Sequence, residues 1–264
     1  MARALITGCS TGIGRATAVE LVKRGHEVVA TARRPETLDD LDVSLRLGLH
    51  TTSDASVAAA RAAAGDVDVL INNAGIGVGG PVEAVPLDRA MTMFDTNFWG
   101  AARMVQAFAP GMRERSRGWI VNVTSLAGRA VAPLNGYYSA SKWALEALSE
   151  AMESELGHFG IRVVVIEPGF IDTPILVKEA DIGVDGPPYD ELARQWDAAA
   201  GKLRGGPIPG PELVAGAIAD ILDDDEPVLR HPVGADAEMI VAMRDTMGYE
   251  EFVATVREFL GLSW

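Results

Sequence analysis

The stretch Ala4-Leu5-Ile6-Thr7-Gly8-Cys9-Ser10-Thr11-Gly12-Ile13-Gly14 decides the fold of this 264-residue chain. A short apolar run, typical of a buried strand, passes into a turn with three glycines and then into an amphipathic pattern that predicts a helix over residues 13–24. Glycines at such a junction let the backbone approach a phosphate, and the free amides of the first helical turn point toward it. The stretch therefore predicts a dinucleotide-binding turn, although the same glycines could also form a turn without a ligand.

Short apolar runs alternate with amphipathic stretches along most of the chain, which is the pattern of β-α-β units. Gly25 stands where a left-handed residue should end the first helix. The alternation predicts an α/β fold, a single Rossmann-type, doubly wound parallel sheet of about seven strands with helices on both faces. Further strands are expected at residues 28–30, 45–49, 67–71, 119–123, 162–166 and 228–229.

One segment departs from this alternation. Residues 174–211 are rich in glycine, proline and charge, and they contain only a short helical pattern around residues 190–200. We expect this segment to be a substrate lid. The chain length suits a single domain over residues 1–264, in which dinucleotide binding and catalysis share one core.

Composition limits the partners and the chemistry. The net charge of −14 and the lack of a Lys/Arg run argue against binding to nucleic acid or to an anionic membrane. Cys9 is the only cysteine, and the four histidines lie far apart without metal-ligand spacing. The sequence shows no signal-peptide pattern and no apolar run of membrane-spanning length. We therefore expect a cytoplasmic protein without a metal site.

Four further motifs follow in order near the carboxyl ends of expected strands. They are Asn72-Asn73-Ala74-Gly75, Ser125, Tyr138-Ser139-Ala140-Ser141-Lys142 and Pro168-Gly169. Together with the glycine turn they resemble the short-chain dehydrogenase/reductase family over nearly the whole chain. Residues 28–38 and 232–236 are similar, more narrowly, to hydroxysteroid- and retinol-dehydrogenase-like members. The resemblance implies an oxidoreductase that moves a hydride between a nicotinamide dinucleotide and an alcohol or carbonyl substrate.

Tyr138 and Lys142 form the expected proton-transfer pair. A hydride leaves an alcohol carbon only if the hydroxyl proton also leaves, so the site needs a base. Lys142 lies about 40° around the helix from Tyr138, where its charge lowers the pKa of the phenol, whereas Tyr137 lies about 140° away. Tyr138 is therefore the expected proton donor and acceptor. The alternative is an exposed helix pair without function, which Ser125 and the glycine turn argue against.

The resemblance also assigns roles to the neighbours of this pair. Lys142 would hydrogen-bond the nicotinamide ribose, Ser125 would hold the substrate oxygen, and Asn97 would anchor a water that links Lys142 to solvent. Asn97 lies in a helical pattern, where an asparagine is often structural instead. Cofactor contacts are expected at Gly8, Ser10, Gly12, Ile13, Gly14, Arg33, Arg34, Asn73, Ala74, Gly75, Tyr138, Lys142, Pro168, Gly169 and Thr173.

The end of the second expected strand favours NADP(H) over NAD(H). In this fold a carboxylate here repels the 2′-phosphate of the adenine ribose, whereas an arginine binds it. Ala32 stands where NAD-preferring relatives have aspartate, and Arg33 and Arg34 follow it. A solvated pair of arginines is the alternative.

Two departures from the family pattern concern the same cofactor. Many NADP-binding members carry a second basic residue in the glycine turn, where this chain has Ser10 and Thr11. An aspartate that contacts adenine often follows the third strand, where this chain has His50 or Thr51. Phosphate binding is therefore expected to depend mainly on the two arginines after the second strand.

Two other functions share parts of the pattern. A sugar-nucleotide epimerase uses the hydride transiently, but such relatives usually have a Gly-x-x-Gly-x-x-Gly turn and a larger C-terminal substrate domain. A dinucleotide-sensing protein binds without turnover, and such proteins commonly lose the Tyr-Lys pair that this chain retains. The oxidoreductase hypothesis therefore explains more of these sequence features than either alternative.

Two further predictions concern the substrate class and the oligomeric state. The substrate is expected to be lipophilic, because Val131, Ala132 and Pro133 precede Tyr138 and the expected lid begins with the apolar residues 175–177. Ala-rich helices around residues 101–108 and 143–156 resemble those that pair between subunits in the family, which favours a homodimer or homotetramer.

Overall fold

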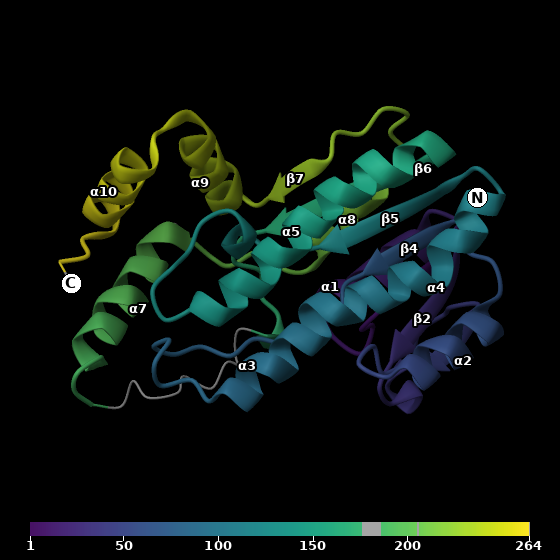
Figure 1. The fold of residues 1–264 in the computed structure, drawn as a ribbon, viewed down its shortest axis with the longest axis horizontal. Helices are drawn as coiled ribbons and strands as arrows, with labels where there is room; N and C mark the ends of the chain where they lie inside the picture. Colours follow the sequence, from purple (N-terminus) through teal and green to yellow (C-terminus); the bar gives the residue numbers. More distant parts are fainter. Residues whose placement is uncertain (176–185, 205, 264) are drawn as a thin grey trace.

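The sheet positions the site, because the carboxyl ends of parallel strands meet at one edge. In the computed structural model, which describes residues 1–175, 186–204 and 206–263, seven parallel strands follow the order β3-β2-β1-β4-β5-β6-β7. The order reverses between β1 and β4, which opens a crevice beside the first strand. The predicted Rossmann-type sheet is confirmed, and Figure 1 shows its path.

The elements have the following bounds. The strands are β1 Arg3–Ile6, β2 Glu27–Ala32, β3 Leu45–Gly48, β4 Val69–Asn72, β5 Gly118–Val123, β6 Ile161–Pro168 and β7 Arg230–Val233. The α-helices are α1 Gly12–Lys23, α2 Asp54–Ala64, α3 Leu87–Phe94, α4 Gly100–Glu114, α5 Gly136–Leu156, α7 Asp190–Arg204, α8 Glu212–Leu222, α9 Ala235–Thr246 and α10 Tyr249–Leu260. The short helical turns are η1 Pro35–Leu38, η2 Asp95–Trp99, η3 Leu126–Gly128 and η4 Gly157–Phe159.

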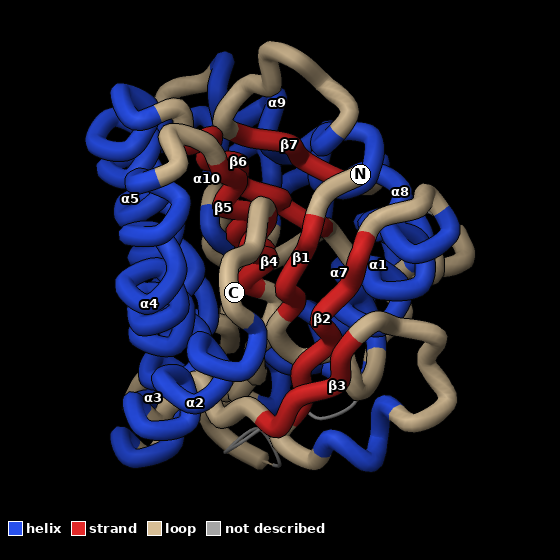
Figure 2. Tube along the Cα trace, turned by 90° about the vertical axis from the view of Figure 1, so that its right-hand side faces the viewer, coloured by secondary structure: helices blue, strands red, loops and turns tan. Residues whose placement is uncertain are grey.

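The sheet is buried on both faces, because successive side chains of a strand point to opposite sides. In β1, Ala4 and Ile6 enter one apolar layer and Leu5 enters the other. Helices α1 and α8 cover the first layer, and α2, α4 and α5 cover the second (Figure 2). Burial on both faces explains why the central strands are continuous apolar runs in the sequence.

The first helix ends as predicted. Gly25 has a left-handed φ of +84°, and its amide donates to the carbonyl oxygen of Val22 at 2.9 Å. A residue with a Cβ would be strained in this conformation. The chain can therefore turn sharply out of α1 and into β2.

The prediction of a strand at residues 228–229 is wrong, because β7 begins two residues later. Val228 is exposed, and pairing starts where the Val165 amide donates to the Leu229 carbonyl oxygen at 2.7 Å. β7 pairs only with β6 and forms one of the two edges of the sheet. An edge strand tolerates Pro232 and half-exposed side chains, so apolar content alone misplaced it.

Helices α7, α9 and α10 lie beyond the carboxyl ends of the strands, where the arrowheads in Figure 1 point. α10 packs against both α7 and α9. α7 falls within the expected lid of residues 174–211, but residues 176–185 and 205 lie outside the described residues, so the lid stays a prediction.

None of the helices in the described part of the chain combines the length and hydropathy of a membrane-spanning segment. The expected cytoplasmic location stays a prediction. Among residues 1–175, 186–204 and 206–263, no group of His, Cys, Asp and Glu side chains has the arrangement of a metal site.

Candidate active site

The glycine turn has the close approaches that its sequence predicts. Gly8 and Gly12 have φ of +77° and +60°, in the left-handed region that favours glycine. A methyl group on Gly14 would overlap Nδ2 of Asn73 and the carbonyl oxygen of Gly8. Gly14 therefore lets α1 start directly beneath the turn, while Gly8 and Gly12 face the cavity.

Asn73 and Thr7 hold this turn against the end of β4. Nδ2 of Asn73 donates to the carbonyl oxygens of Thr7, at 2.9 Å, and Gly8, at 3.2 Å. The hydroxyl of Thr7 accepts from the amides of Asn73 and Ala74, both at 2.9 Å. These hydrogen bonds fix the glycine turn to the residues that follow β4, beside the crevice between β1 and β4. Thr7 was not among the predicted site residues, and its place at a strand end before the glycine turn was the available signal.

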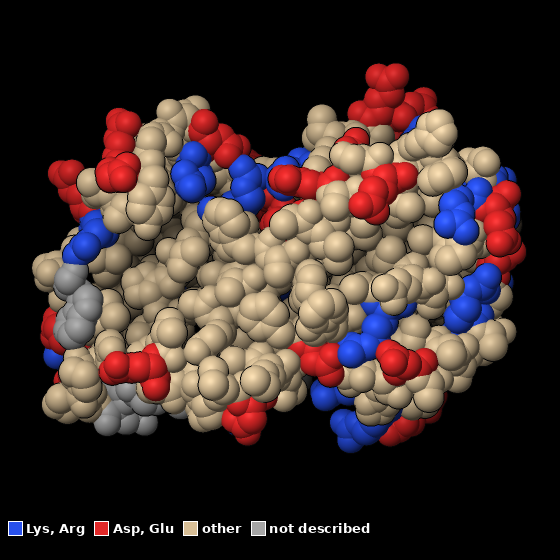
Figure 3. Space-filling model, in the orientation of Figure 1, with Lys and Arg blue, Asp and Glu red and all other residues tan. Residues whose placement is uncertain are grey.

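A cavity of about 1540 Å³ opens at the carboxyl edge of the sheet. It is larger than the roughly 300–1,000 Å³ of typical small-molecule pockets, which leaves room for a dinucleotide and a substrate together. Figure 3 shows one hollowed face with few charged atoms inside it. The predicted residues that line the cavity are Gly8, Ser10, Gly12, Ile13, Arg33, Asn73, Ala74, Gly75, Ser125, Tyr138, Lys142, Pro168, Gly169 and Thr173. Gly14, Arg34 and Asn97 do not line it.

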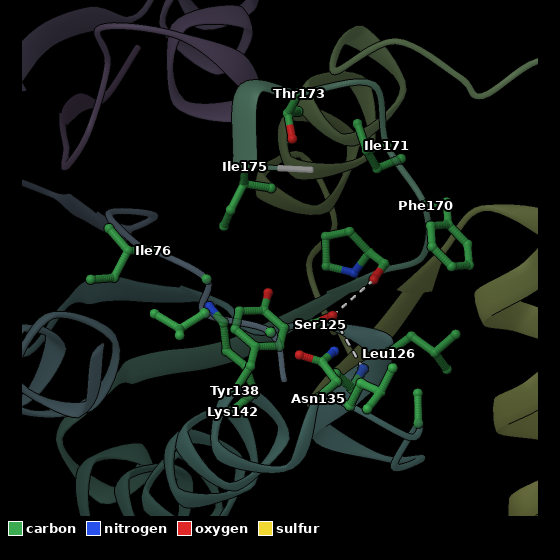
Figure 4. A pocket seen from close by; sticks show the side chains of 18 of the residues that line it. Ile76, Ser125, Leu126, Asn135, Tyr138, Lys142, Phe170, Ile171, Thr173 and Ile175 are labelled. Carbon is green, nitrogen blue, oxygen red and sulfur yellow. Dashed lines mark hydrogen bonds between the residues drawn. The ribbon is translucent and has the colours of Figure 1, made fainter. Parts of the chain in front are cut away.

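Ser125 lies directly after β5, at the start of η3. Its Oγ accepts from the Ala127 amide at 3.1 Å and lies 3.5 Å from the carbonyl oxygen of Pro168. Figure 4 shows Ser125 and Tyr138 facing the same space, with Ile171, Thr173 and Ile175 on the opposite side. The Ser125 hydroxyl is therefore placed to donate to an oxygen bound in the cavity.

Tyr138 and Lys142 share one side of α5, as the helical spacing predicts. The Nζ of Lys142 is 5.7 Å from the ring centroid of Tyr138. Tyr138 lines the cavity, whereas the neighbouring Tyr137 is not among the described lining residues and packs near Val78 and Val85.

The Lys142 ammonium is buried, with 4% of the residue exposed, and donates to the carbonyl oxygen of Val123 at 3.0 Å. Burial lowers the pKa of Lys142 to about 8, because water no longer solvates the charge, and the nearby Glu146 opposes the shift. The ammonium remains mostly charged near pH 7. A cation with a weakly held proton therefore lies beside the tyrosine.

Asn97 lies in η2, beneath the cavity. Its Oδ1 accepts from the Ile76 amide at 2.9 Å, and its Nδ2 donates to the Ile76 carbonyl oxygen at 3.0 Å and to Ser141 Oγ at 3.1 Å. Through Asn97, these bonds join the segment that follows β4 to α5. The expected water relay to Lys142 stays a prediction.

The two arginines after β2 differ in position. Arg33 lines the cavity beside Ala32, and His50 and Thr51 line the same end. Both arginine side chains are exposed, but Arg34 precedes η1, where its carbonyl oxygen accepts from the Thr37 amide and hydroxyl. Within the described part of the chain neither guanidinium forms an ion pair. The structure thus brings Arg33, but not Arg34, to the cavity.

A buried ionic network beneath the site was missed by sequence reasoning. Glu146 accepts from Thr124 Oγ1 at 2.6 Å and from Arg230 Nε at 3.0 Å, and Glu167 accepts from Arg129 at 3.0 Å. Burial raises the pKa values of Glu146 and Glu167. The partners are far apart in sequence, and the only available signal was the spacing of Glu146, one helical turn after Lys142.

Cys9, at the base of the turn, is fully buried. Its thiol donates to the Ile6 carbonyl oxygen at 3.3 Å, and burial raises its pKa to about 12. A thiol in this state is a poor nucleophile, so Cys9 fills space in the turn.

The chain is similar to known proteins over most of its length. Residues 2–181 match the family described as short chain dehydrogenase. Human retinol dehydrogenase 8 is 37% identical over 246 residues, which cover 86% of this chain and 79% of that protein. A short chain dehydrogenase from Burkholderia cenocepacia, solved in complex with NADP, has a TM-score of 0.80 at 26% identity and 97% coverage of each chain. A 3-ketoacyl-(acyl-carrier-protein) reductase from Brucella melitensis, solved with NADH, has a TM-score of 0.71 at 27% identity, covering 83% of this chain and 89% of that one.

Proposed function

This chain belongs to the short-chain dehydrogenase/reductase family, and on that premise we propose that it transfers a hydride between NADP(H) and a lipophilic alcohol or carbonyl compound. One observation carries the proposal. Ser125, Tyr138 and Lys142 line the same cavity as the glycine turn, so the proposed reacting groups and the proposed dinucleotide site lie in one cavity.

Each of the three side chains has a distinct task. During carbonyl reduction, negative charge develops on the substrate oxygen, where the Ser125 hydroxyl donates a hydrogen bond and the Tyr138 hydroxyl donates a proton. The charge of Lys142 stabilises the phenolate that remains. NADP(H), when bound, supplies the hydride in reduction or accepts it in oxidation. Alcohol oxidation reverses the proton transfer at Tyr138.

The residues present fit a phosphorylated dinucleotide. Gly8 and Gly12 line the cavity with main chain that carries no side chain, in a left-handed conformation that favours glycine. Arg33 supports NADP(H), because it lines the cavity without a carboxylate partner among the described residues, and Ala32 supplies no repelling carboxylate. Of the two solved relatives described above, one holds NADP and the other NADH, so the proposed preference rests on Ala32 and Arg33.

The proposed substrate class rests on the side of the cavity opposite Tyr138. Ile171 and Ile175 lie there, and Val131, Ala132 and Leu134 line the same space. Leu176 and Val177, also expected in the pocket, lie outside the described residues. An apolar lining favours lipophilic substrates over sugars.

The alternatives explain fewer of these observations. A dinucleotide sensor needs the glycine turn but has no use for three catalytic side chains in the same cavity. An epimerase of the type considered above would have a different glycine spacing from that of residues 8, 12 and 14.

The test is a panel of alcohols, ketones, aldehydes and sugars, followed by NADPH absorbance. We expect higher kcat/KM for lipophilic ketones and aldehydes than for sugars. Tight NADPH binding without turnover of any compound would favour the sensor instead.

A further inference from the structure

The cavity continues from Tyr138 to a wall formed by α7 and α10. Trp196 and Leu203 of α7 line this part, together with Val253 and Val256 of α10. Figure 3 shows a hollow on the side where these helices lie, with mostly uncharged atoms on its surface. This part of the cavity suits the chain or ring system of a lipophilic molecule.

Hydrogen bonds join α7 and the end of α10 into one wall. Nε2 of Gln195 donates to Ser263 Oγ at 3.0 Å, and the Ser263 amide donates to Gln195 Oε1 at 2.9 Å. Nζ of Lys202 donates to the carbonyl oxygen of Leu260 at 3.3 Å. Side chains of α7 and α10 therefore line the same part of the cavity.

Two arginines on this wall carry charge that no carboxylate of the described residues neutralises. The guanidinium of Arg204 lies 4.9 Å from the ring centroid of Phe170, and Arg257 lies in the last turn of α10. In the described part of the chain neither forms an ion pair. Arg194 also lines the cavity, but it pairs with Glu191 at 2.5 Å.

This wall presents two cations without an ion pair among the described residues, in a protein whose net charge is negative. The chain has 37 Asp and Glu against 23 Lys and Arg, so its long-range field repels anions. On the wall, as far as the structure describes it, the lining residues without an ion pair include one carboxylate, that of Asp197, and the two guanidiniums of Arg204 and Arg257. This end of the cavity therefore presents two guanidiniums that pair with no described carboxylate, although a purely apolar substrate would need no cation there.

A structural role explains only part of this arrangement. Both arginines lie in the last turn of a helix, where a cation interacts favourably with the helix dipole. That interaction does not require the side chain to line a cavity. Arg204 stacks on Phe170, which follows Pro168 and Gly169 beside Ser125 (Figure 4), so its charge lies on the substrate side of the site.

We infer that the substrate is an anionic amphiphile, a lipophilic alcohol or carbonyl compound whose far end carries a carboxylate. The reacting carbon would lie at Ser125 and Tyr138, and the apolar body would lie along α7 and α10. The carboxylate would bind Arg204 and Arg257, whose planar donors match its geometry. This inference rests on the proposed hydride transfer and names its substrate class.

The test compares a long-chain ω-oxo carboxylic acid with its methyl ester as substrates for reduction. In each turnover the aldehyde carbon takes a hydride from NADPH and the oxygen takes a proton, which gives an alcohol and NADP⁺. At low salt we expect kcat/KM for the acid to exceed that for the ester by about five- to thirtyfold, since solvent exposure weakens the charge-assisted pair. The ratio should fall toward one at about 0.5 M salt.

Matched variants locate the effect. Arg204→Gln and Arg257→Gln should each lower kcat/KM for the acid by roughly three- to tenfold and leave the ester within about twofold. Arg194→Gln is the control, because its charge is already paired on the same wall. Equal kcat/KM for the acid and the ester in the wild type, or variants that lower both values equally, would overturn the inference. Reduction of the aldehyde group of the methyl ester would still support the proposed function.

A binding measurement separates the two proposals if neither probe is reduced. Calorimetry with the NADPH-loaded protein would compare the binding of dodecanoate with that of dodecanol, because neither compound can react with NADPH. Tighter binding of dodecanoate that is lost in Arg204→Gln would support the anion site and place the failure in the proposed reaction. Equal binding of both would overturn the anion site.

Discussion

The carboxylate of Asp236 accepts a 2.7 Å hydrogen bond from the main-chain amide of Phe170, which joins the start of α9 to the segment after β6. The same carboxylate occupies the space where a side chain at Gly169 would lie. Asp236 is almost fully buried, so water does not compete for this bond. The Pro168–Phe170 segment, which lines the cavity, is therefore held in place by a helix that follows it by 66 residues.

We predict that Asp236→Ala destabilises the protein by about 1.5–3 kcal/mol, the usual contribution of a hydrogen bond to a charged group. Because the Pro168–Phe170 segment loses its anchor, KM for NADPH should rise more than kcat falls. Urea unfolding and steady-state kinetics measure the two effects. Glu238→Gln, an exposed change on the same helical turn, is the control. A variant with wild-type stability and KM would contradict the stabilising and positioning role of this hydrogen bond.

Tyr138→Phe should lower kcat by at least about a hundredfold, because it removes the transferred proton and little shape. NADPH binding, followed by fluorescence, should stay nearly unchanged. Tyr137→Phe is the matched control and should be mild, since Tyr137 is not among the described lining residues. Equal losses in the two variants would mean that the helical spacing identified the wrong tyrosine.

Lys142 should make the stability of the cofactor-free protein rise above pH 8. Its pKa is about 8 in the folded state, below its ordinary value of 10.5, so the unfolded chain binds more protons between these values. Relative to Lys142→Met, the wild type should gain about 2 kcal/mol between about pH 7.5 and about pH 9.5. Urea unfolding across this range measures the difference. The exposed Lys23→Met should give a curve parallel to that of the wild type, and a flat difference for Lys142→Met would contradict the low pKa.

NADPH should be preferred over NADH, and Arg33 should be the main reason. One charge-assisted interaction with the 2′-phosphate contributes about ten- to a hundredfold in affinity, less where water and salt screen it. Ala32→Asp combined with Arg33→Leu should reverse the preference, because it removes the attraction and adds a repulsion. Specificity constants for both cofactors give the answer, with Arg34→Leu as the neighbouring control. A wild type that favours NADH would leave Arg33 as a solvated charge.

The expected homodimer or homotetramer has a candidate surface on α4 and α5, which lie on the same side of the sheet (Figure 2). Trp99, just before α4, and Trp143 of α5 are exposed. If this surface pairs between subunits, Trp99→Ser with Trp143→Ser should shift the mass measured by light scattering toward that of a monomer. Phe159→Ser, an exposed aromatic just beyond α5, is the control. A wild-type monomer at micromolar concentration would rule out the proposed assembly.

Local sequence patterns were sufficient to predict much of the fold. The apolar runs predicted six of the seven strands within a few residues, because buried parallel strands need apolar side chains on both faces. The same rule failed for β7, whose edge position requires less apolar character. The spacing of Tyr138 and Lys142 predicted their shared side of α5, since helix geometry depends only on residue number.

The sequence by itself determined the α/β class and the glycine turn, and it predicted the reacting side chains, because these depend on periodicity and on residue type within short segments. Only the tertiary structure decided which partners those residues meet. It joined Asp236 to Phe170, placed Glu146 and Glu167 on Arg230 and Arg129, and turned the Asn73 amide toward the glycine turn. Contacts of this kind join segments brought together by the winding of the sheet, and no local pattern records them.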